Sequence, residues 1–317
     1  MPSNPPLSRT HFVAPLDETP LVAVDTVSVA DKPSNLWLDA WRDIRRRPLF
    51  YFAGAVVLVA LIIAVFPQLF TRLDPTYCEL GLSNGGPVSG HPLGFTKQGC
   101  DVYSRIIFGT RTSLTIGLLV TVLVTVLGIV IGSLAGFYGG WIDAVLSRIG
   151  DIFFAIPYIL AAVVIMSIVP SADRNILILA LAIGFFAWPS TARVLRGQIL
   201  QVRSSDFVTS ATALGVSRFR ILLRHVLPNS IAPVIVITTI GFAGAIVAEA
   251  TLSFLGIGLP PAVMSWGRDI SDAQNDLRNN PMTLIYPSIA LSITVLAFIL
   301  LGEVVRDALD PKARAQR

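Results

Sequence analysis

The sequence predicts an all-α membrane protein with six transmembrane helices and with both termini in the cytoplasm. Three observations predict this fold class: the composition, six long apolar segments, and the distribution of basic residues. Hydrophobic residues make up 53% of the 317 positions and charged residues only 14%, and the mean hydropathy is +0.70. A soluble domain of this length is about a quarter charged, so the excess of apolar side chains indicates burial in lipid.

Six segments are apolar enough, or nearly so, to cross a bilayer, which takes roughly 20 mostly apolar residues. The fourth is short, and we extend it through Ala192 because Arg193 and Arg196 mark its exit. The first begins too late in the chain and is too long for the apolar core of a cleavable signal peptide. The six predicted spans cover residues 49–66, 112–137, 152–170, 176–189, 230–248 and 284–302.

The basic residues predict the orientation. With six spans both termini lie on one side, and the segments on that side carry 17 of the 24 Lys and Arg residues. Cytoplasmic loops of membrane proteins carry such an excess of positive charge. The termini are therefore predicted to be cytoplasmic. The same bias explains the basic isoelectric point better than binding to nucleic acid does, because a net charge of +4 is modest.

The chain before the first span has two parts. Residues 1–35 are rich in proline and lack helical periodicity, which predicts a disordered cytoplasmic tail. Residues 36–48 predict an amphipathic helix on the membrane surface, because Trp37, Trp41 and Ile44 share one face. A basic anchor without a specific role is the alternative. The remaining predicted units are a first transmembrane unit (49–70), an extracytoplasmic loop (71–111) and a five-span core (112–310).

Glycines recur at helical spacing in two spans. Gly128, Gly132, Gly136 and Gly140 follow one another every four residues and so predict one small-residue face of the second span. Small residues at this spacing let another helix approach closely in lipid. We favour packing within the chain over packing against a partner. In the fifth span, Gly241 and Gly244 predict a second close contact.

The predicted outer loop 71–111 contains both cysteines of the chain, Cys78 and Cys100. Disulfides persist on the outer side of a membrane, so we predict that the two are bridged. Two separate thiols are the alternative. Two cysteines and one nearby histidine, His91, are too few for a metal site.

Signals of catalysis are nearly absent. None of the three lysines follows a glycine, which excludes the phosphate-binding Walker A loop, and the three histidines form no H-E-x-x-H motif. The segment GLSNG (residues 81–85) matches G-x-S-x-G, but it falls in an irregular loop rather than on a strand-to-helix elbow. An intramembrane enzyme therefore remains only as a weak alternative.

Glu249 is the acidic residue that stands out within the predicted spans. Ionisable groups inside a membrane are costly and often functional. We take Glu249 as a candidate for the transport pathway, with two alternatives: a place at the interface, or a hydrogen bond to a neighbouring helix.

A basic helical hairpin is predicted between spans four and five. Phe207, Ala211 and Leu214 share one apolar face of a first helix, and Gly215 can end it in a left-handed cap. Ser217 can cap a second helix, whose apolar face would hold Phe219, Leu222, Leu223 and Val226. The turn is like that of DNA-reading helix-turn-helix proteins, but about thirty residues tied to the bilayer at both ends do not reach a major groove. A groove on a cytoplasmic partner suits the hairpin better.

Several stretches together resemble one family. The segment SDFVTSATALGVSRFRILLRHVLPN resembles the cytoplasmic coupling loop, or EAA loop, of bacterial ABC importer permeases, with Gly215 and the Leu227-Pro228 pair at the family's spacing. HPLGFTKQGCDVYSRIIFGTRTSL, GFYGGWIDAVLSRIGDIFFAIPYIL and EATLSFLGIGLPPAVMSWGRDI resemble the dipeptide and oligopeptide branch, specifically its DppC/OppC-type subunit. The resemblance covers roughly residues 36–310.

The resemblance implies a type I ABC importer permease fold, a location in the bacterial cytoplasmic membrane and a set of partners. These are a second homologous permease, two ATPase subunits beneath, an extracytoplasmic binding protein that delivers peptide, and membrane lipids. ATP and Mg would bind the ATPases, with no cofactor on this chain. The coupling loop would span 203–228, and its proposed ATPase-coupling residues are Asp206, Phe207, Thr209, Ser210, Ala211, Leu214, Gly215, Arg218, Arg220, Arg224, His225 and Pro228.

The sequence departs from the family pattern at two places. The family's Glu-Ala-Ala is here Thr209-Ser210-Ala211, which removes the glutamate, although Asp206 can substitute for it. The usual Gly-Arg-Asp of the outer loop is here Gly99-Cys100-Asp101, which strengthens the disulfide prediction. The sequence therefore predicts the permease of an ATP-driven importer of short peptides, with a nickel or haem importer as the alternative within the class.

Overall fold

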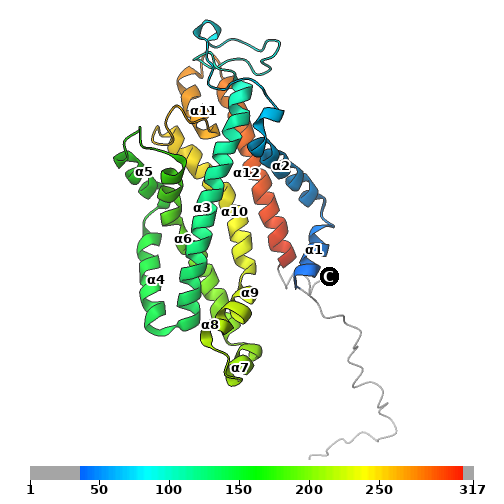
Figure 1. The fold of residues 1–317 in the computed structure, drawn as a ribbon, viewed down its shortest axis with the longest axis vertical. Coiled ribbons are helices and arrows are strands. Elements are labelled where there is room, and N and C mark those ends of the chain that lie inside the picture. The colour runs from blue at the N-terminus through cyan, green and yellow to red at the C-terminus, as the bar shows by residue number, and fades with distance from the viewer. Residues whose placement is uncertain (1–35, 310–317) are drawn as a thin grey trace, which may run out of the picture.

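The computed structural model describes residues 36–309 of the chain as a bundle of long helices (Figure 1). The predicted tail 1–35 lies outside the described residues. Five helices are long and apolar enough to cross a membrane, and a bent pair adds a sixth span if it counts as one. The five are α2 (Pro48–Val65), α3 (Val102–Tyr138), α6 (Ile176–Arg203), α10 (Ala232–Phe254) and α12 (Met282–Leu309). The predicted all-α fold with six spans is confirmed on this count.

The third span is broken into α4 (Gly140–Ala155) and α5 (Tyr158–Ile168), whose axes differ by 75°. Pro157 causes the break, because proline has no N–H to donate and forces the residue before it out of the helical region. Ile156 accordingly has an extended backbone, with φ −91° and ψ 117°. The span predicted at residues 152–170 is thus the upper part of a longer, bent element that starts at Gly140.

Two spans extend well beyond their predicted ends. Helix α3 begins at Val102 rather than at residue 112, because Asp101 caps it by accepting a hydrogen bond from the Ser104 N–H at 2.7 Å. The outer loop is shorter than the predicted 71–111 for the same reason. Helix α6 begins after the cap residue Asn175 and continues past Pro189 to Arg203.

Three of the four predicted glycines bring α3 against α6. A Cβ atom on Gly128 would lie 2.6 Å from the Thr191 side chain, and one on Gly132 would lie 2.6 Å from the carbonyl oxygen of Ala192. Gly136 meets the same helix at Arg196 and Ile199. The three glycines, called the glycine seam below, therefore pack within the chain.

The other predicted glycine contacts are absent from the described structure. Gly140 lies outside the seam, because α3 ends at Tyr138 and Gly139 and Gly140, with φ of 68° and 56°, turn the chain into α4. Gly241 and Gly244 have no atom of another element within 4 Å of a Cβ position, so they make no close helix contact among the described residues. They face an open groove instead.

The short helix α1 (Leu36–Ile44) packs on the end of α12. Ala40 is buried with Ala308 and Val236, and Ile44 packs against the same cluster. Trp41, predicted on the apolar face, is half exposed, and Arg45 lies over its ring at 5.8 Å. Arg47 joins the two elements through ion pairs with Asp43 and Asp307.

Short helices fill the remaining connections. Between α6 and α10 lie α7 (Asp206–Ala213), α8 (Arg218–Ile221) and α9 (Leu227–Ser230), and between α10 and α12 lies α11 (Trp266–Ala273). Figure 1 shows α7 at one end of the bundle and the loop before α3 at the other. Both ends of the described chain lie toward the α7 end (Figure 1).

Candidate functional site

The connection between α6 and α10 is a tight helical hairpin. Helix α7 ends at Ala213, and Gly215, two residues later, has a left-handed backbone with φ 77°. The Val216 N–H donates to the Ala211 carbonyl at 3.2 Å, and the Gly215 N–H donates to the Thr212 carbonyl at 3.0 Å. This pair of bonds is the Schellman motif that closes helices at glycine. The predicted turn at Gly215 is present. Ser217 starts α8 but makes no side-chain capping hydrogen bond.

The buried face of the hairpin differs from the predicted one. Val208, Ala211, Ile221, Leu222 and Val226 are buried together against Leu195 and Ile199 of α6. Of the predicted α7 face only Ala211 is buried, whereas Phe207 is 45% exposed and Leu214 is 83% exposed. The buried stripe runs between Val208 and Ala211, so Phe207 lies at its edge and Leu214 lies beyond the last helical residue.

The outer surface of the hairpin therefore combines apolar and basic side chains. Phe207, Leu214, Phe219 and Leu223 are exposed large hydrophobic residues, and we call these four the coupling patch. Arg218, Arg220 and Arg224 are exposed beside them and have no ion pair within the described residues. Of the other predicted coupling residues, Asp206, Thr209, Ser210 and Pro228 are exposed, and His225 is half buried.

Ion pairs hold the hairpin's supporting helices together. Arg196 of α6 donates two hydrogen bonds to the Asp143 carboxylate of α4, at 2.5 and 2.7 Å. Arg203, at the end of α6, donates to the Phe137 carbonyl of α3 at 3.0 Å. In the sequence, Arg196 marks only the exit of the fourth predicted span. Its partner is 53 residues away, so no local pattern reveals the pair.

A groove of about 390 Å³ opens in the middle of the bundle, between α3, the α4–α5 break, α6 and α10. Its lining is mainly apolar and aromatic, and none of its described lining residues is charged. Hydroxyls supply the polarity: Thr125 and Thr238 are hydrogen-bonded at 3.1 Å, and the buried Thr121 hydroxyl has no partner among the described residues. Gly241 and Gly244 lie in this lining.

Glu249 lies apart from this groove. Its side chain is fully buried, and its carboxyl oxygens accept hydrogen bonds from Ser265 at 2.7 Å, Ser253 at 2.9 Å and Ser113 at 3.5 Å. The Ser113 hydroxyl in turn accepts the Trp266 N–H. Serines from α3, α10 and the start of α11 enclose Glu249 in this structure, and its role in a pathway stays a prediction. The alternative of a hydrogen bond to a neighbouring helix is correct.

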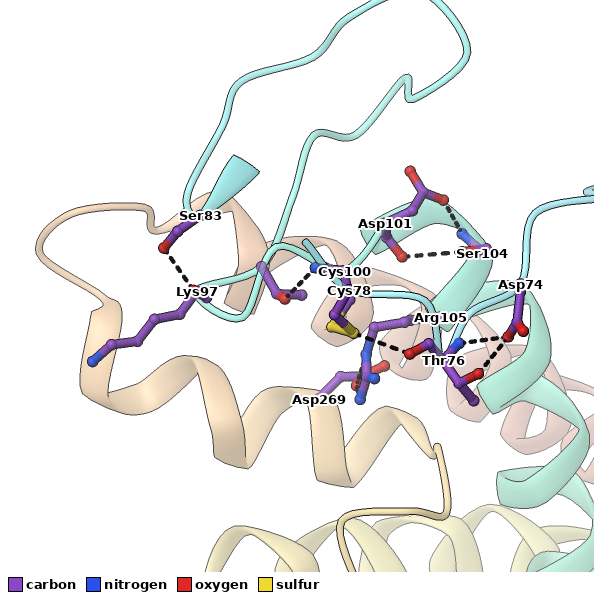
Figure 2. The surroundings of a disulfide bond; sticks show 11 residues. Asp74, Thr76, Cys78, Ser83, Lys97, Cys100, Asp101, Ser104, Arg105 and Asp269 are labelled. Atoms are coloured by element: carbon purple, nitrogen blue, oxygen red, sulfur yellow. Dashed lines mark hydrogen bonds and ion pairs between the residues drawn. A yellow bond between two sulfur atoms is a disulfide. The ribbon is translucent and has the colours of Figure 1, made fainter. Parts of the chain in front are cut away.

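A disulfide joins Cys78 to Cys100 at the opposite end of the molecule, as predicted (Figure 2). The Glu79 N–H donates to the Gly99 carbonyl, and the Cys100 N–H donates to the Thr96 hydroxyl, which together fold the loop back on itself. Closing a loop of this length stabilises the fold by about 3 kcal/mol in the chain-entropy model.

The loop lies next to an ion pair between α3 and α11. The Arg105 guanidinium donates to Asp269 Oδ1 at 2.8 Å (Figure 2). Burial raises the pKa of the Asp269 carboxyl, and the charge of Arg105 acts against that rise. The two residues are 164 positions apart, so no local pattern in the sequence predicts the pair.

Comparisons with known proteins agree with this architecture. Residues 128–315 match the family model described as "Binding-protein-dependent transport system inner membrane component". Residues 35–83 match the model described as "N-terminal TM domain of oligopeptide transport permease C". The chain is 37% identical over 280 residues to the glutathione transport system permease protein GsiD of Pectobacterium atrosepticum, covering 88% of this chain and 92% of the relative.

A second relative and a solved structure give the same picture. GsiD of Escherichia coli O6:K15:H31 is 35% identical over 302 residues, which cover 95% of this chain and 97% of the relative. A chain of the MetNI methionine ABC transporter, solved in an inward-facing conformation, superposes with a TM-score of 0.54 at 17% identity. That superposition covers 65% of this chain and 96% of the other, and it reflects a shared fold.

Proposed function

Because this chain belongs to the binding-protein-dependent transport permeases, as a DppC/OppC-type permease subunit of an ABC importer, we propose that it moves short peptides such as glutathione across the cytoplasmic membrane. The relatives at 35–37% identity over most of the chain are named for glutathione transport. The uncharged groove, lined by aromatic rings and hydroxyls, suits small substrates whose charges are neutralised or at their ends. We therefore favour a short peptide over nickel or haem as the transported substrate.

The partners in this proposal are a second homologous permease, two ATPase subunits and an extracytoplasmic binding protein. A second permease would close the open side of the groove and complete the pathway. ATP and Mg would bind the ATPases rather than this chain. Lipids would surround the apolar side chains that α2 exposes, such as Phe52 and Leu58.

The coupling patch is the observation that carries the ATPase contact. Four large apolar side chains would not remain exposed on an isolated hairpin without a cost, and contiguous apolar patches mark protein interfaces. The hairpin is also held firmly, because its buried face packs on α6 and Arg203, at the end of α6, ties that helix to α3. A displacement of the patch by an ATPase would therefore pass directly to α3 and α6.

The missing glutamate of the family motif does not remove this surface. Thr209 stands near the place of the glutamate and is exposed, with its hydroxyl donating to the Ser205 carbonyl at 3.4 Å. Asp206, one turn earlier, is also exposed and supplies a negative charge. In this proposal, apolar contact from the coupling patch carries most of the binding to the ATPase.

Leu214→Asp tests the proposal. Leu214 is mostly exposed, so the change should leave the fold intact while placing a charge in the interface. Loss of a buried interface anchor costs about 2 kcal/mol or more, which is roughly 30-fold in affinity. We expect less ATPase to co-purify with the variant and peptide uptake to fall accordingly.

The matched control is Leu80→Asp, an equivalent change at a residue that is 77% exposed in the outer loop. It should leave both the ATPase yield and uptake unchanged. Normal co-purification and uptake by Leu214→Asp would contradict the proposed contact.

A further inference from the structure

A second cleft, of about 410 Å³, lies at the outer end of the molecule. Its walls are the disulfide loop, the first turns of α3 and α12, and one face of α11 with the turn after it. Figure 2 shows the disulfide and the Arg105–Asp269 pair at this place. The volume falls within the range of small-molecule sites. The uncharged groove described above shares no lining residue with this cleft.

Three carboxylates line the cleft at helical spacing: Asp269, Asp272 and Asp276. Arg105 binds Asp269 through Oδ1, and Arg268 pairs with Asp272 at 2.8 Å. Asp276 Oδ1 accepts a hydrogen bond from the Asn279 side chain at 2.7 Å. The second oxygen of two of these carboxyls has no such partner. Asp269 Oδ2 and Asp276 Oδ2 are buried and accept no hydrogen bond from the described residues.

These two oxygens indicate a ligand. Asp269 is 8% exposed and Asp276 is 3% exposed, so bulk water does not solvate them freely. A buried acceptor without a partner costs about 1–3 kcal/mol, and more when it is charged. Two such acceptors in the wall of one cleft are therefore expected to receive donors from a molecule that enters it.

The surrounding groups define the chemistry of that molecule. A divalent cation does not fit, because no cluster of three or more His, Cys, Asp or Glu residues within residues 36–309 is placed to hold one. An ammonium group fits, because it offers three N–H donors and one positive charge. The cleft also contains a cation for the other end of a zwitterion: Lys97 is exposed in its wall, and Figure 2 shows its ammonium group directed away from Asp269.

We propose that this cleft binds a short peptide by its free α-ammonium group, which donates to Asp269 Oδ2 and Asp276 Oδ2, while Lys97 binds the peptide's carboxylate. The site lies at the end of the bundle opposite the coupling hairpin (Figure 1). A peptide bound there would therefore be held at the outer side of the permease before transport. This inference rests on the proposed peptide transport and adds to it a recognition site outside the groove.

The test uses the assembled transporter in nanodiscs, with its partner permease and ATPases but without the binding protein. Its probes are L-alanyl-L-alanine and N-acetyl-L-alanyl-L-alanine, and saturation-transfer NMR measures their binding. The free peptide should bind about tenfold or more tightly than the acetylated one, because acetylation removes the charged donor. Asp276→Asn should abolish that difference, since an amide keeps the contact to Asn279 and loses the negative charge.

Three controls make the result decisive. Basal ATP hydrolysis reports that each variant is folded and assembled. Asp173→Asn, at an exposed outer acid away from the cleft, should preserve the preference for the free peptide. Uptake of the same peptide by wild-type transporter with its binding protein tests the proposed function separately.

The outcomes separate the two claims. Wild-type uptake without any preference for the free peptide would overturn the cleft site and leave peptide transport standing. Equal binding of the two probes would also overturn it; if the Asp276→Asn transporter then captures less binding protein when that protein is added, the two oxygens belong to a contact with a basic side chain of that protein. If the transporter prefers the free peptide but the wild type does not take it up, the result supports the cleft site and contradicts the proposed peptide transport.

Discussion

Gly215 is the residue on which the shape of the hairpin depends. Its φ of 77° is a left-handed conformation, and open space surrounds its Cβ position. A side chain there would therefore meet no neighbour, and its cost would come from the backbone alone. The free-energy cost is about 1–2 kcal/mol for an ordinary L-residue, and it is smaller for asparagine, which adopts this conformation more readily.

We predict that Gly215→Val breaks coupling while Gly215→Asn largely preserves it. Valine should force the turn into another conformation, shift the coupling patch and reduce peptide uptake at least severalfold. The measurement is uptake normalised to the amount of chain in the membrane, so that lost insertion is not counted as lost coupling. Equal uptake by the two variants would show that the left-handed turn is not what the ATPase requires.

Glu249 shows how the meaning of a single residue depends on its surroundings. A carboxylate in an apolar segment suggests a functional group, and sequence alone leaves its role open. The three serines that donate to it come from positions 113, 253 and 265, and two of these lie outside its own helix. Buried polar groups that are fully hydrogen-bonded fix the packing of the elements that supply them. Glu249 therefore joins α3, α10 and α11.

At the scale of elements, the α3–α6 contact is the most extensive among the described helices, and the glycine seam makes it possible. In lipid, helices associate through close packing because the hydrophobic effect gives no preference for helix over lipid. A Cβ on Gly128 or Gly132 would lie 2.6 Å from atoms of α6, which leaves no room for it, and one on Gly136 would make a tight contact at 3.0 Å. The Gly132 position faces backbone, which cannot rotate away as a side chain does.

We predict that Gly132→Ala destabilises the folded chain by about 1–3 kcal/mol, the usual cost of overpacking. Thermal unfolding of the purified chain in mild detergent measures the effect as a lower midpoint. Gly54→Ala is the matched control, because Gly54 lies within α2 with nothing within 4 Å of its Cβ position. If the unfolding midpoint of Gly132→Ala equals that of the control, the close approach of α3 and α6 at Gly132 does not stabilise the fold.

The elements also show what spacing in the sequence can and cannot predict. A four-residue repeat places glycines on one face only while the helix continues, and the repeat gave no sign that α3 ends before Gly140. The residue before a proline avoids helical geometry, so Pro157 is a local reason for the break between α4 and α5, yet the predicted span 152–170 ran through it. Pro189 lies inside α6 without ending it, so proline alone does not decide where a membrane helix stops.

At the scale of the whole molecule, the spans were predictable and the contacts between them were not. Lipid requires each crossing segment to satisfy its own backbone, so a long apolar run is sufficient to predict a helix. The turn at Gly215 is local and was predicted, whereas the cap at Asp101 is also local but was not, because the predicted span began at residue 112. Arg105–Asp269 and Asp143–Arg196 join distant segments, and only the folded chain brings them together.

The same scale determines the last prediction, the orientation of the molecule in its membrane. Helix α6 runs from Ile176 to Arg203, just before the hairpin, so the connection before it and the hairpin lie at opposite ends of a span. Within residues 36–309, most basic residues lie toward the hairpin end, and positive charge is retained on the cytoplasmic side. In right-side-out vesicles, a membrane-impermeant maleimide should therefore label Ser171→Cys at once and Ser217→Cys only after permeabilisation. Both serines are exposed, and the native cysteines are bridged and do not react. The reverse labelling order would place the coupling patch outside, where no ATP is available, and would overturn the ATPase contact along with the orientation.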